Sequence, residues 1–145
     1  MPQLTILADT SSVWGLANSK DHWHNLATAE HAQISRSAAK FVISRIAWIE
    51  CFGHASRLKP RDKSMIANFR TLPVQTIESW NWPIEEHAAD DFAQAREWWL
   101  NAKVAMDLPD LLTAATALRL GYRVWTYDQL LMQFLAEHGS PAPLD

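Results

Sequence analysis

Residues 4–11 read LTILADTS, and this stretch decides the fold class because an apolar run leads directly into an acidic, hydroxyl-rich turn. The run from Leu4 to Ala8 is typical of a buried strand of a parallel sheet, since such strands are apolar on both faces. Asp9-Thr10-Ser11 then breaks the run and offers an N-cap to a short helix at about Val13 to Ala17. A buried strand followed at once by a helix is the repeating unit of α/β proteins.

The rest of the chain repeats this unit, alternating short apolar segments with longer segments of helical spacing. This order predicts one α/β domain over residues 1–145, in which helices cover both faces of a central parallel sheet. No internal repeat or linker interrupts the sequence. Further strands are expected at residues 41–44, 74–77 and 123–126, and helices at about residues 23–33, 46–52, 62–70, 83–104, 109–120 and 129–137.

The composition fits a globular cytoplasmic protein. Of the 145 residues, 48% are hydrophobic and 20% are charged, which is ordinary for a domain with its own core. No apolar run approaches the ~20 residues that span a bilayer, and the first residues lack the basic segment of a secretory signal. The single cysteine, Cys51, cannot form an internal disulfide, which agrees with a reducing compartment. The net charge of -3 gives no general sign of nucleic-acid binding.

Four acidic residues stand at the ends of apolar elements or within them. Asp9 and Asp128 each follow an expected strand, Asp110 opens an expected helix, and Glu50 interrupts the apolar helix after the second strand. Open parallel sheets bind ligands at the carboxyl ends of their strands, so one cleft could collect all four. Carboxylates beside a core are costly to desolvate unless a cation offsets their charge. Because oxygen-only ligands suit Mg²⁺ or Mn²⁺ better than zinc, the pattern favours a metal-dependent hydrolase.

Each acid also has a local explanation. Asp9 fits as the N-cap of the first helix, and Asp110 fits as a first-turn partner of a helix dipole. Glu50 could occupy an exposed stripe of its helix, and Asp128 could be a turn residue. Asp107 competes with Asp110 as the functional acid but is favoured as a loop or cap residue. One shared site explains the four positions more simply than four separate local roles.

Four segments of the chain together carry a family resemblance. They are ILADTS at residues 6–11, IS at 43–44 with WIE at 48–50, LPDLLTAATA at 108–117, and WTYD at 125–128. In this order they resemble the signature segments of the PIN-domain ribonucleases, and most of all those of the VapC-type toxins of prokaryotic toxin–antitoxin pairs. The segment from Asp110 to Ala117 is the most specific, whereas a short piece such as Asp9-Thr10-Ser11 is weak by itself.

The resemblance implies a PIN-like three-layer α/β/α fold whose central parallel sheet has four or five strands in the order 3-2-1-4-5. It implies an endoribonuclease that depends on Mg²⁺ or Mn²⁺, forms a homodimer and is inhibited by a small antitoxin protein. A fifth strand would have to come from residues 139–145, which are short and proline-rich. The implied catalytic and metal-binding residues are Asp9, Glu50, Asp110 and Asp128, with Thr10, Ser11 and Thr126 as supporting polar residues.

A basic group follows the helix that carries Glu50. Arg57, Lys59, Arg61 and Lys63 could bind an RNA backbone, since phosphate contacts supply most non-specific affinity for nucleic acids. They could equally form a charged loop without any such role. The alternative to an enzyme is a non-catalytic PIN-like binding module acting through protein or RNA contacts, and the presence of all four acids argues against it.

Three further groups have both a chemical and a structural interpretation. The residues 22–24 could form a metal-binding or RNA-stacking patch, or simply a solvated surface. Cys51 and His54 could pair as nucleophile and base, although a cysteine within an apolar helix is more often inert packing. Trp48 and Trp125 are expected in the core, whereas Trp80, Trp82, Trp98 and Trp99 are dense enough to form a dimer or antitoxin groove.

Overall fold

The structure, a computed structural model, describes residues 3–58, 71–101 and 105–144. Its strands form one all-parallel sheet in the order β3-β2-β1-β4. This confirms the expected α/β class and the first four positions of the expected strand order. The strands are β1 (Thr5–Ala8), β2 (Lys40–Ser44), β3 (Ile84–Glu85) and β4 (Arg123–Trp125).

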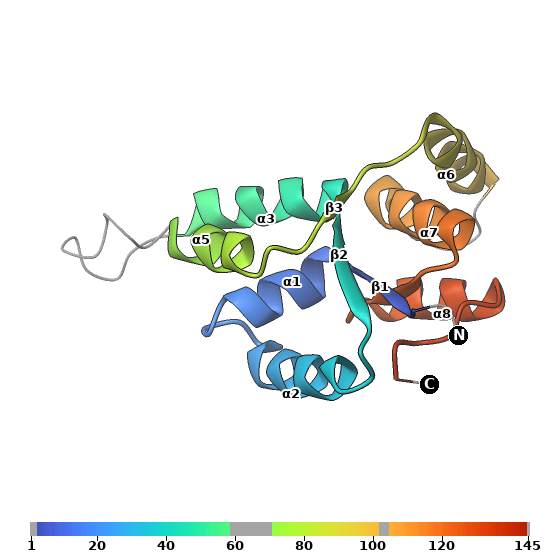
Figure 1. The fold of residues 1–145 in the computed structure, drawn as a ribbon. Helices are drawn as coiled ribbons and strands as arrows, with labels where there is room; N and C mark the ends of the chain where they lie inside the picture. The colour runs from blue at the N-terminus through green and yellow to red at the C-terminus, as the bar shows by residue number, and fades with distance from the viewer. Residues whose placement is uncertain (1–2, 59–70, 102–104, 145) are drawn as a thin grey trace.

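Helices cover both faces of the sheet, which gives the expected three layers (Figure 1). Because side chains alternate between faces along a strand, Ile6 and Ala8 join one core cluster whereas Leu7 joins the other. None of the described helices is both long and apolar enough to cross a membrane. On the first face lie α1 (Thr10–Ala17), α2 (His24–Ser35), α3 (Arg45–Arg57) and α5 (Thr71–Ser79); on the second lie α6 (Ala89–Asn101), α7 (Leu108–Leu120) and α8 (Gln129–Glu137).

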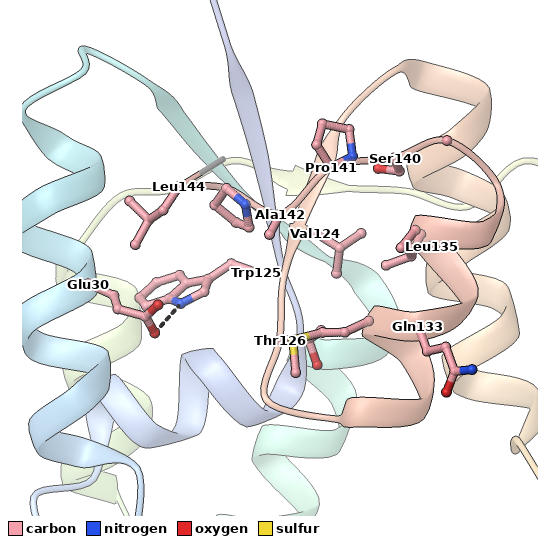
Figure 2. A pocket seen from close by; sticks show the side chains of 14 residues that line it. Glu30, Val124, Trp125, Thr126, Gln133, Leu135, Ser140, Pro141, Ala142 and Leu144 are labelled. Atoms are coloured by element: carbon pink, nitrogen blue, oxygen red, sulfur yellow. Dashed lines mark hydrogen bonds between the residues drawn. The ribbon is translucent and has the colours of Figure 1, made fainter.

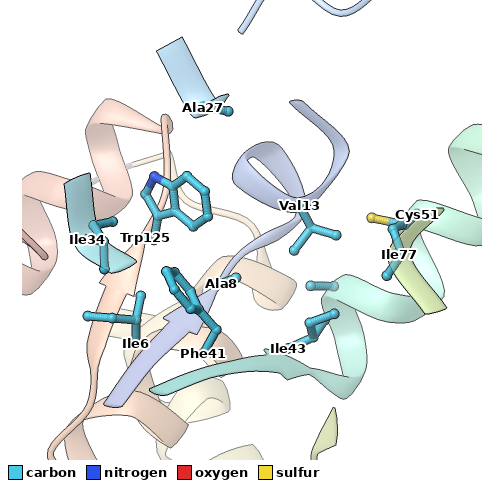
Figure 3. Packing of buried hydrophobic residues seen from close by; sticks show 11 residues of the cluster. Ile6, Ala8, Val13, Ala27, Ile34, Phe41, Ile43, Cys51, Ile77 and Trp125 are labelled. Atoms are coloured by element: carbon cyan, nitrogen blue, oxygen red, sulfur yellow. The ribbon is translucent and has the colours of Figure 1, made fainter. Parts of the chain in front are cut away.

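Strand β1 is an inner strand of the sheet, and its residues from Ile6 to Ala8 are 0% exposed. The first core cluster packs against it around the indole of Trp125 (Figure 3). At the carboxyl end of β1, Ala8 pairs with Ile43 of β2 on one side and with Trp125 of β4 on the other. The segments that follow these three strands, including Asp9, therefore leave the sheet at the same edge.

The ends of α7 and α8 follow the sequence expectations closely. Asp107 is the N-cap of α7, where its Oδ1 accepts a 3.0 Å hydrogen bond from the Asp110 N–H. Gly121 ends α7 in the left-handed region at φ 70°, a conformation that glycine adopts without strain. Asp128 caps α8 in the same way, through a 3.1 Å bond from the Leu131 N–H. The interpretation of Asp107 as a cap is confirmed.

The expected strand at residues 74–77 is wrong, because this segment lies within helix α5. Its β-branched residues favour a strand when they are considered locally. In the structure Pro73 and Ile77, one helical turn apart, are the buried residues of α5, and Ile77 is only 2% exposed. The apolar period was therefore that of a helix and not of a strand.

The third strand instead follows Pro83, where a helix was expected. Ile84 pairs with Ile43 of β2, and the Pro83 carbonyl accepts a 2.9 Å bond from the Ile43 N–H. Helix α6 begins only at Ala89, so the expected helical start at residue 83 is wrong. The helix expected at residues 62–70 lies outside the described residues.

The C-terminal segment does not extend the sheet. Residues 138–144, which are described, form no strand, so the sheet ends at β4 within the described chain. A cavity of about 690 Å³ separates this segment from β4 and α8, and mainly apolar side chains line it, including Val124, Trp125 and Leu135 (Figure 2). One carboxylate at its wall, that of Glu30, accepts a long 3.5 Å hydrogen bond from the Trp125 indole.

Candidate active site

An acidic cleft of about 470 Å³ opens at the carboxyl ends of β1 and β4. All four of the acids that the sequence singled out line this cleft, although they come from four separate elements. No lysine or arginine belongs to the described lining, so its charge is negative. The lining residues are Asp9, Thr10, Ser11, Trp14, Asp21, Trp23, Glu50, His54, Asp107, Asp110 and Asp128.

Asp9 is the most buried of these acids, with 4% exposure. Its Oδ2 accepts a 2.8 Å hydrogen bond from the Thr126 hydroxyl. Burial raises the pKa of Asp9 to about 6, against the hydrogen bond from Thr126, and the charges of Glu50 and Asp128 add to the increase. Asp9 occupies the N-cap position of α1, all of whose residues are described, but its side chain makes no capping hydrogen bond there. Helix capping therefore does not account for this carboxylate.

Asp110 lies in the first turn of α7, half-buried in the cleft. Burial raises its pKa to about 8, and the charges of Asp9, Asp107 and Asp128 contribute to the increase. A like charge disfavours ionisation because two carboxylates repel each other across a short distance. The proximity of the other acids thus adds to the effect of burial on the pKa of Asp110.

Glu50 and Asp128 complete the acidic lining. Glu50, on α3, accepts a 2.7 Å hydrogen bond from the Thr10 hydroxyl of α1. This bond joins residues from two helices and fixes the side chain of Glu50 beside β1. Asp128 serves both as the N-cap of α8 and as part of the cleft, so its local and functional interpretations are compatible.

Two of the expected supporting residues, Ser11 and Thr126, form a directed chain of hydrogen bonds that ends on Asp9. Thr126 uses its only hydroxyl proton to bond Asp9, so it must accept the 3.2 Å bond that it shares with the Ser11 hydroxyl. Ser11 in turn accepts a 2.9 Å bond from the Tyr127 N–H. The Asp128 N–H also donates to the Thr126 hydroxyl, at 3.1 Å. Both hydroxyl groups of this chain donate one hydrogen bond and accept at least one, which restricts the orientation of Asp9.

Ser12 and Trp14 were not singled out from the sequence, and His54 was considered only as a possible base for Cys51. Ser12 is fully buried and donates a 2.6 Å hydrogen bond to the Trp125 carbonyl, which ties α1 to β4. Trp14 and His54 also line the cleft. Helical spacing could have indicated both residues, because Trp14 lies one turn after Thr10 and His54 lies one turn after Glu50.

The oxygen-bearing side chains of the cleft are of the type that binds a hard divalent cation, but they do not converge on a single point. The nearest side chains offer carboxylate and hydroxyl oxygens, which suit Mg²⁺ or Mn²⁺. Across residues 3–58, 71–101 and 105–144, no three acidic, imidazole or thiol groups already converge at ligand distance. Burial raises the pKa of Asp9 and of Asp110, and the charges of the neighbouring carboxylates add to both increases.

The remaining sequence expectations have mixed outcomes. Cys51 is completely buried, and burial raises the pKa of its thiol far above the ordinary value, so the interpretation as inert packing holds. Arg57 is exposed at the end of α3 and bonds His54, whereas Lys59, Arg61 and Lys63 lie outside the described residues. Trp125 is in the first core cluster as expected, and Trp48 is partly buried and packs against that cluster. Of the other tryptophans, Trp80, Trp82 and Trp98 pack against the cores, and Trp99 is 53% exposed.

Comparison with known proteins gives fold relatives but no sequence relatives. No protein-family model and no curated protein matches the sequence. Among solved structures, the toxin VapC20 of Mycobacterium tuberculosis, which cleaves the sarcin-ricin loop, is similar with a TM-score of 0.68 at 17% identity, over 89% of this chain and 94% of that one. VapBC2 from Rickettsia felis, bound to a DNA fragment from its promoter, is similar with a TM-score of 0.67 at 12% identity, over 91% of this chain and 93% of that one. FitAcB from Neisseria gonorrhoeae is similar with a TM-score of 0.60 at 18% identity, over 94% of this chain and 95% of that one.

These similarities extend over nearly the full length of each chain. The chain therefore has the PIN-like α/β fold, with a four-stranded parallel sheet in the order 3-2-1-4. The resemblance to the VapC-type PIN-domain proteins is confirmed at the level of fold. Because a fold can host many functions, function must be argued from the cleft.

Proposed function

We propose that this protein is a metal-dependent endoribonuclease, the toxin of a toxin–antitoxin pair. The observation that carries the proposal is the meeting of Asp9, Glu50, Asp110 and Asp128 in one cleft from four separate elements. This cleft lies at the carboxyl ends of parallel strands, where α/β sheets bind ligands. The fold relatives, one of which is a toxin that cleaves the sarcin-ricin loop, support the same reaction class.

Mg²⁺ or Mn²⁺ is the proposed cofactor, with Asp9 and Asp110 as central ligands and Glu50 and Asp128 binding directly or through water. Burial and mutual repulsion disfavour the ionised acids, and a divalent cation would offset both effects. When bound, such an ion supplies a water of lowered pKa and neutralises charge on phosphoryl oxygens. The cleft has no cationic side chain in its described lining to neutralise that charge.

The chain's own residues orient the acids. Thr126 holds the buried Asp9, and Thr10 holds Glu50, each through a hydroxyl donor. The bond from Thr126 favours the ionised form of Asp9, and both bonds restrict the orientation of the carboxylates. Hydroxyl partners of this kind fix the geometry of metal-binding carboxylates and tune their affinity. Thr10, Ser11 and Thr126 are therefore positioning residues in the proposed mechanism.

The proposed partners are an RNA substrate, a small antitoxin and a second copy of the chain. Exposed apolar side chains are available for protein contacts on two helices. On α3, Ile49 and Phe52 are 55% and 43% exposed, and on α6, Phe92 and Trp99 are 54% and 53% exposed. Large apolar and aromatic side chains of this kind are favoured at protein interfaces. Arg57, next to the cleft residue His54, is the described member of the proposed RNA-binding group.

The test is cleavage of a mixed pool of tRNA, rRNA and mRNA by the purified protein in Mg²⁺, Mn²⁺ or EDTA. The proposal expects cleavage with either ion and none in EDTA. Asp9→Asn and Asp110→Asn should abolish cleavage, whereas Asp90→Asn, an exposed acid on α6, should retain it. Equal cleavage by wild type and both cleft variants would refute the assigned site.

The alternative is a PIN-like binding module without catalysis. The open arrangement of the acids is the observation in its favour, since no described trio is closed around a cation. Calorimetric titration with Mg²⁺ or Mn²⁺ separates the two functions. The nuclease requires uptake that Asp9→Asn and Asp110→Asn abolish, whereas the binding module predicts no carboxylate-dependent uptake.

A further inference from the structure

A second cavity lies beside β4, at the edge of the sheet. Its volume is about 690 Å³, and the C-terminal segment at residues 139–144 closes it on one side (Figure 2). None of its described lining residues belongs to the acidic cleft. A space of this size is within the range that holds small organic molecules in proteins. The proposed nuclease function gives this cavity no role.

The walls of the cavity are mainly apolar and are held in place by hydrogen bonds. Val124 and Leu135 are buried side chains of its lining. The C-terminal segment is fixed near both of its ends, because the Ser140 N–H donates a 2.9 Å bond to the Leu135 carbonyl and Arg123 donates a 3.2 Å bond to the Ala142 carbonyl. The space is therefore formed before any ligand enters it.

The cavity is also accessible from solvent. Two of its apolar lining residues, Met132 and Leu144, are 38% and 42% exposed. Covering such side chains with an apolar group is favourable, since it removes apolar surface from water. The cavity thus favours a ligand with an apolar body.

One carboxylate, that of Glu30, belongs to this otherwise mainly apolar lining. Figure 2 shows it directed from α2 toward the indole of Trp125. Its Oε1 accepts hydrogen bonds from the Trp125 indole N–H at 3.5 Å and from the Tyr127 hydroxyl at 2.5 Å. Its Oε2 bonds no group in the described part of the chain. Since every buried side-chain nitrogen and oxygen there has a partner, Oε2 must be open to the cavity or to solvent.

The charge of Glu30 has no counterpart among the residues that the structure describes. No basic side chain there forms an ion pair with Glu30, and none lines the cavity. A carboxylate beside apolar walls is costly unless a cation offsets its charge. An ammonium group would supply that cation and a charge-assisted hydrogen bond to Oε2. The indole of Trp125, which lines the same space, adds a ring that attracts cations.

We propose that this cavity binds a small aromatic amine, whose ammonium group pairs with Glu30 and whose apolar body packs between β4, α8 and the C-terminal segment. Because the chain's own C-terminal segment closes one side, the space fits a compact molecule rather than a protein surface. An acidic ligand is disfavoured, since its charge would repel Glu30. The inference does not depend on the proposed nuclease function.

The experiment titrates the full-length, isotope-labelled protein at pH 7 with three ligands of similar shape. Phenethylamine carries the ammonium group, propylbenzene replaces it by a methyl group, and phenylpropanoate replaces it by a carboxylate. The NMR signal of the Trp125 indole N–H, the donor to Glu30, should shift saturably with phenethylamine. Propylbenzene should bind about ten- to a hundredfold more weakly, because it lacks the charge-assisted hydrogen bond, and phenylpropanoate more weakly still. Equal binding of all three, or no saturable shift at Trp125, overturns the inference.

A charge variant tests the position of the ammonium group. Glu30→Gln removes the charge but keeps an oxygen acceptor for Trp125 and Tyr127. It should lower phenethylamine affinity by about tenfold or more and leave propylbenzene binding unchanged. The matched control, Glu97→Gln, neutralises an exposed acid on α6 and should behave as wild type. Full phenethylamine affinity in Glu30→Gln would place the amine elsewhere, the acidic cleft included, and overturns the inference.

A blocking variant tests the position of the apolar body. Ala136 is exposed on α8 and lines the cavity, so Ala136→Phe should occupy part of the space without disturbing the core. It should weaken the binding of both phenethylamine and propylbenzene, and unchanged binding of both overturns the inference. Since the ligand series on wild type needs no variant, a misfolded variant cannot hide a negative result.

A fourth ligand separates a small amine from a protein side chain. N-acetyl-lysine methylamide presents the ammonium group of a lysine without an aromatic body. If it binds Glu30 more tightly than phenethylamine does, the cavity belongs to a lysine of a partner protein and the inference is overturned. RNA cleavage plays no part in these titrations, so the nuclease proposal and this inference succeed or fail separately.

Discussion

The hydroxyl of Thr126 lies 2.8 Å from the Asp9 carboxylate, although 117 residues separate the two in the sequence. The pairing of β1 with β4 brings them together, because Ala8 is opposite Trp125 and both strands end at the same edge. Asp9 and Thr126, each one residue beyond its strand, are therefore close enough to form a hydrogen bond. This contact connects the topology of the sheet to the chemistry of the cleft.

Replacing Thr126 by valine should lower metal affinity by about tenfold or more, the range found for partners of metal ligands. Valine keeps the shape but removes the donor to Asp9 and the acceptor for the Asp128 N–H. Calorimetric titration with Mn²⁺ measures the change, and Thr126→Ser, which keeps the hydroxyl, should restore most of the affinity. Unchanged affinity in Thr126→Val would show that this hydrogen bond does not matter to the ion.

Metal binding should weaken as the pH falls from about 8 to about 5. The pKa of Asp9 is raised to about 6 and that of Asp110 to about 8, so both bind protons in this range and metal must displace them. Titration in two buffers of different ionisation enthalpy should show proton release on binding at pH 7. Metal uptake without proton release would mean that neither acid is protonated in the metal-free cleft.

Asp110→Asn should stabilise the metal-free protein at pH 8 while abolishing cleavage. The folded-state pKa is raised, so ionising Asp110 opposes folding: the penalty is absent below the unfolded value near 3.8 and grows as the pH rises towards 8. After allowance for partial exposure, the free energy of unfolding of Asp110→Asn should exceed that of wild type by about 1–3 kcal/mol. Thermal melts in EDTA measure it. The difference from wild type should vanish near pH 4, and a destabilised variant at pH 8 would contradict the repulsion inferred here.

Local signals in the sequence were sufficient for the elements next to the site. β1 and β2 are recognisable as apolar runs, and α7 is recognisable from its proline at the start and Gly121 at the end. Helix α8 was expected with the bounds that the structure has. These predictions succeeded because each feature depends on residues close together in the chain.

The elements that were predicted wrongly depend on partners distant in sequence. β3 is two residues long and exists as a strand only because Ile84 pairs with Ile43. Without that partner, Pro83 resembles a helix start. In helix α5 the β-branched Val74 and Ile77 locally favour a strand, and tertiary packing overrides this preference.

The candidate site was predicted in its residue types but not in its connections. All four acids were identified, since each stands at the end of an apolar element or, as Glu50 does, within one. The direction of the hydrogen bonds from Ser11 through Thr126 to Asp9 required the register of β1 against β4. The burial of Asp91, which lies outside the cleft, was not anticipated from the sequence: this residue is only 2% exposed.

Asp91→Ala should lower the free energy of unfolding by about 2 kcal/mol, because the buried Thr116 hydroxyl and the Arg119 guanidinium would lose their acceptor. Arg119 Nε donates to its carboxylate at 2.7 Å, and the buried Thr116 hydroxyl donates at 2.9 Å. Urea denaturation measures the change, and metal affinity should not alter, because Asp91 is not among the residues lining the cleft. The matched control is Asp90→Ala, at the exposed neighbouring position, which should cost less than about 0.5 kcal/mol. Equal effects of the two substitutions would show that the Asp91 hydrogen bonds add nothing beyond those of a surface carboxylate.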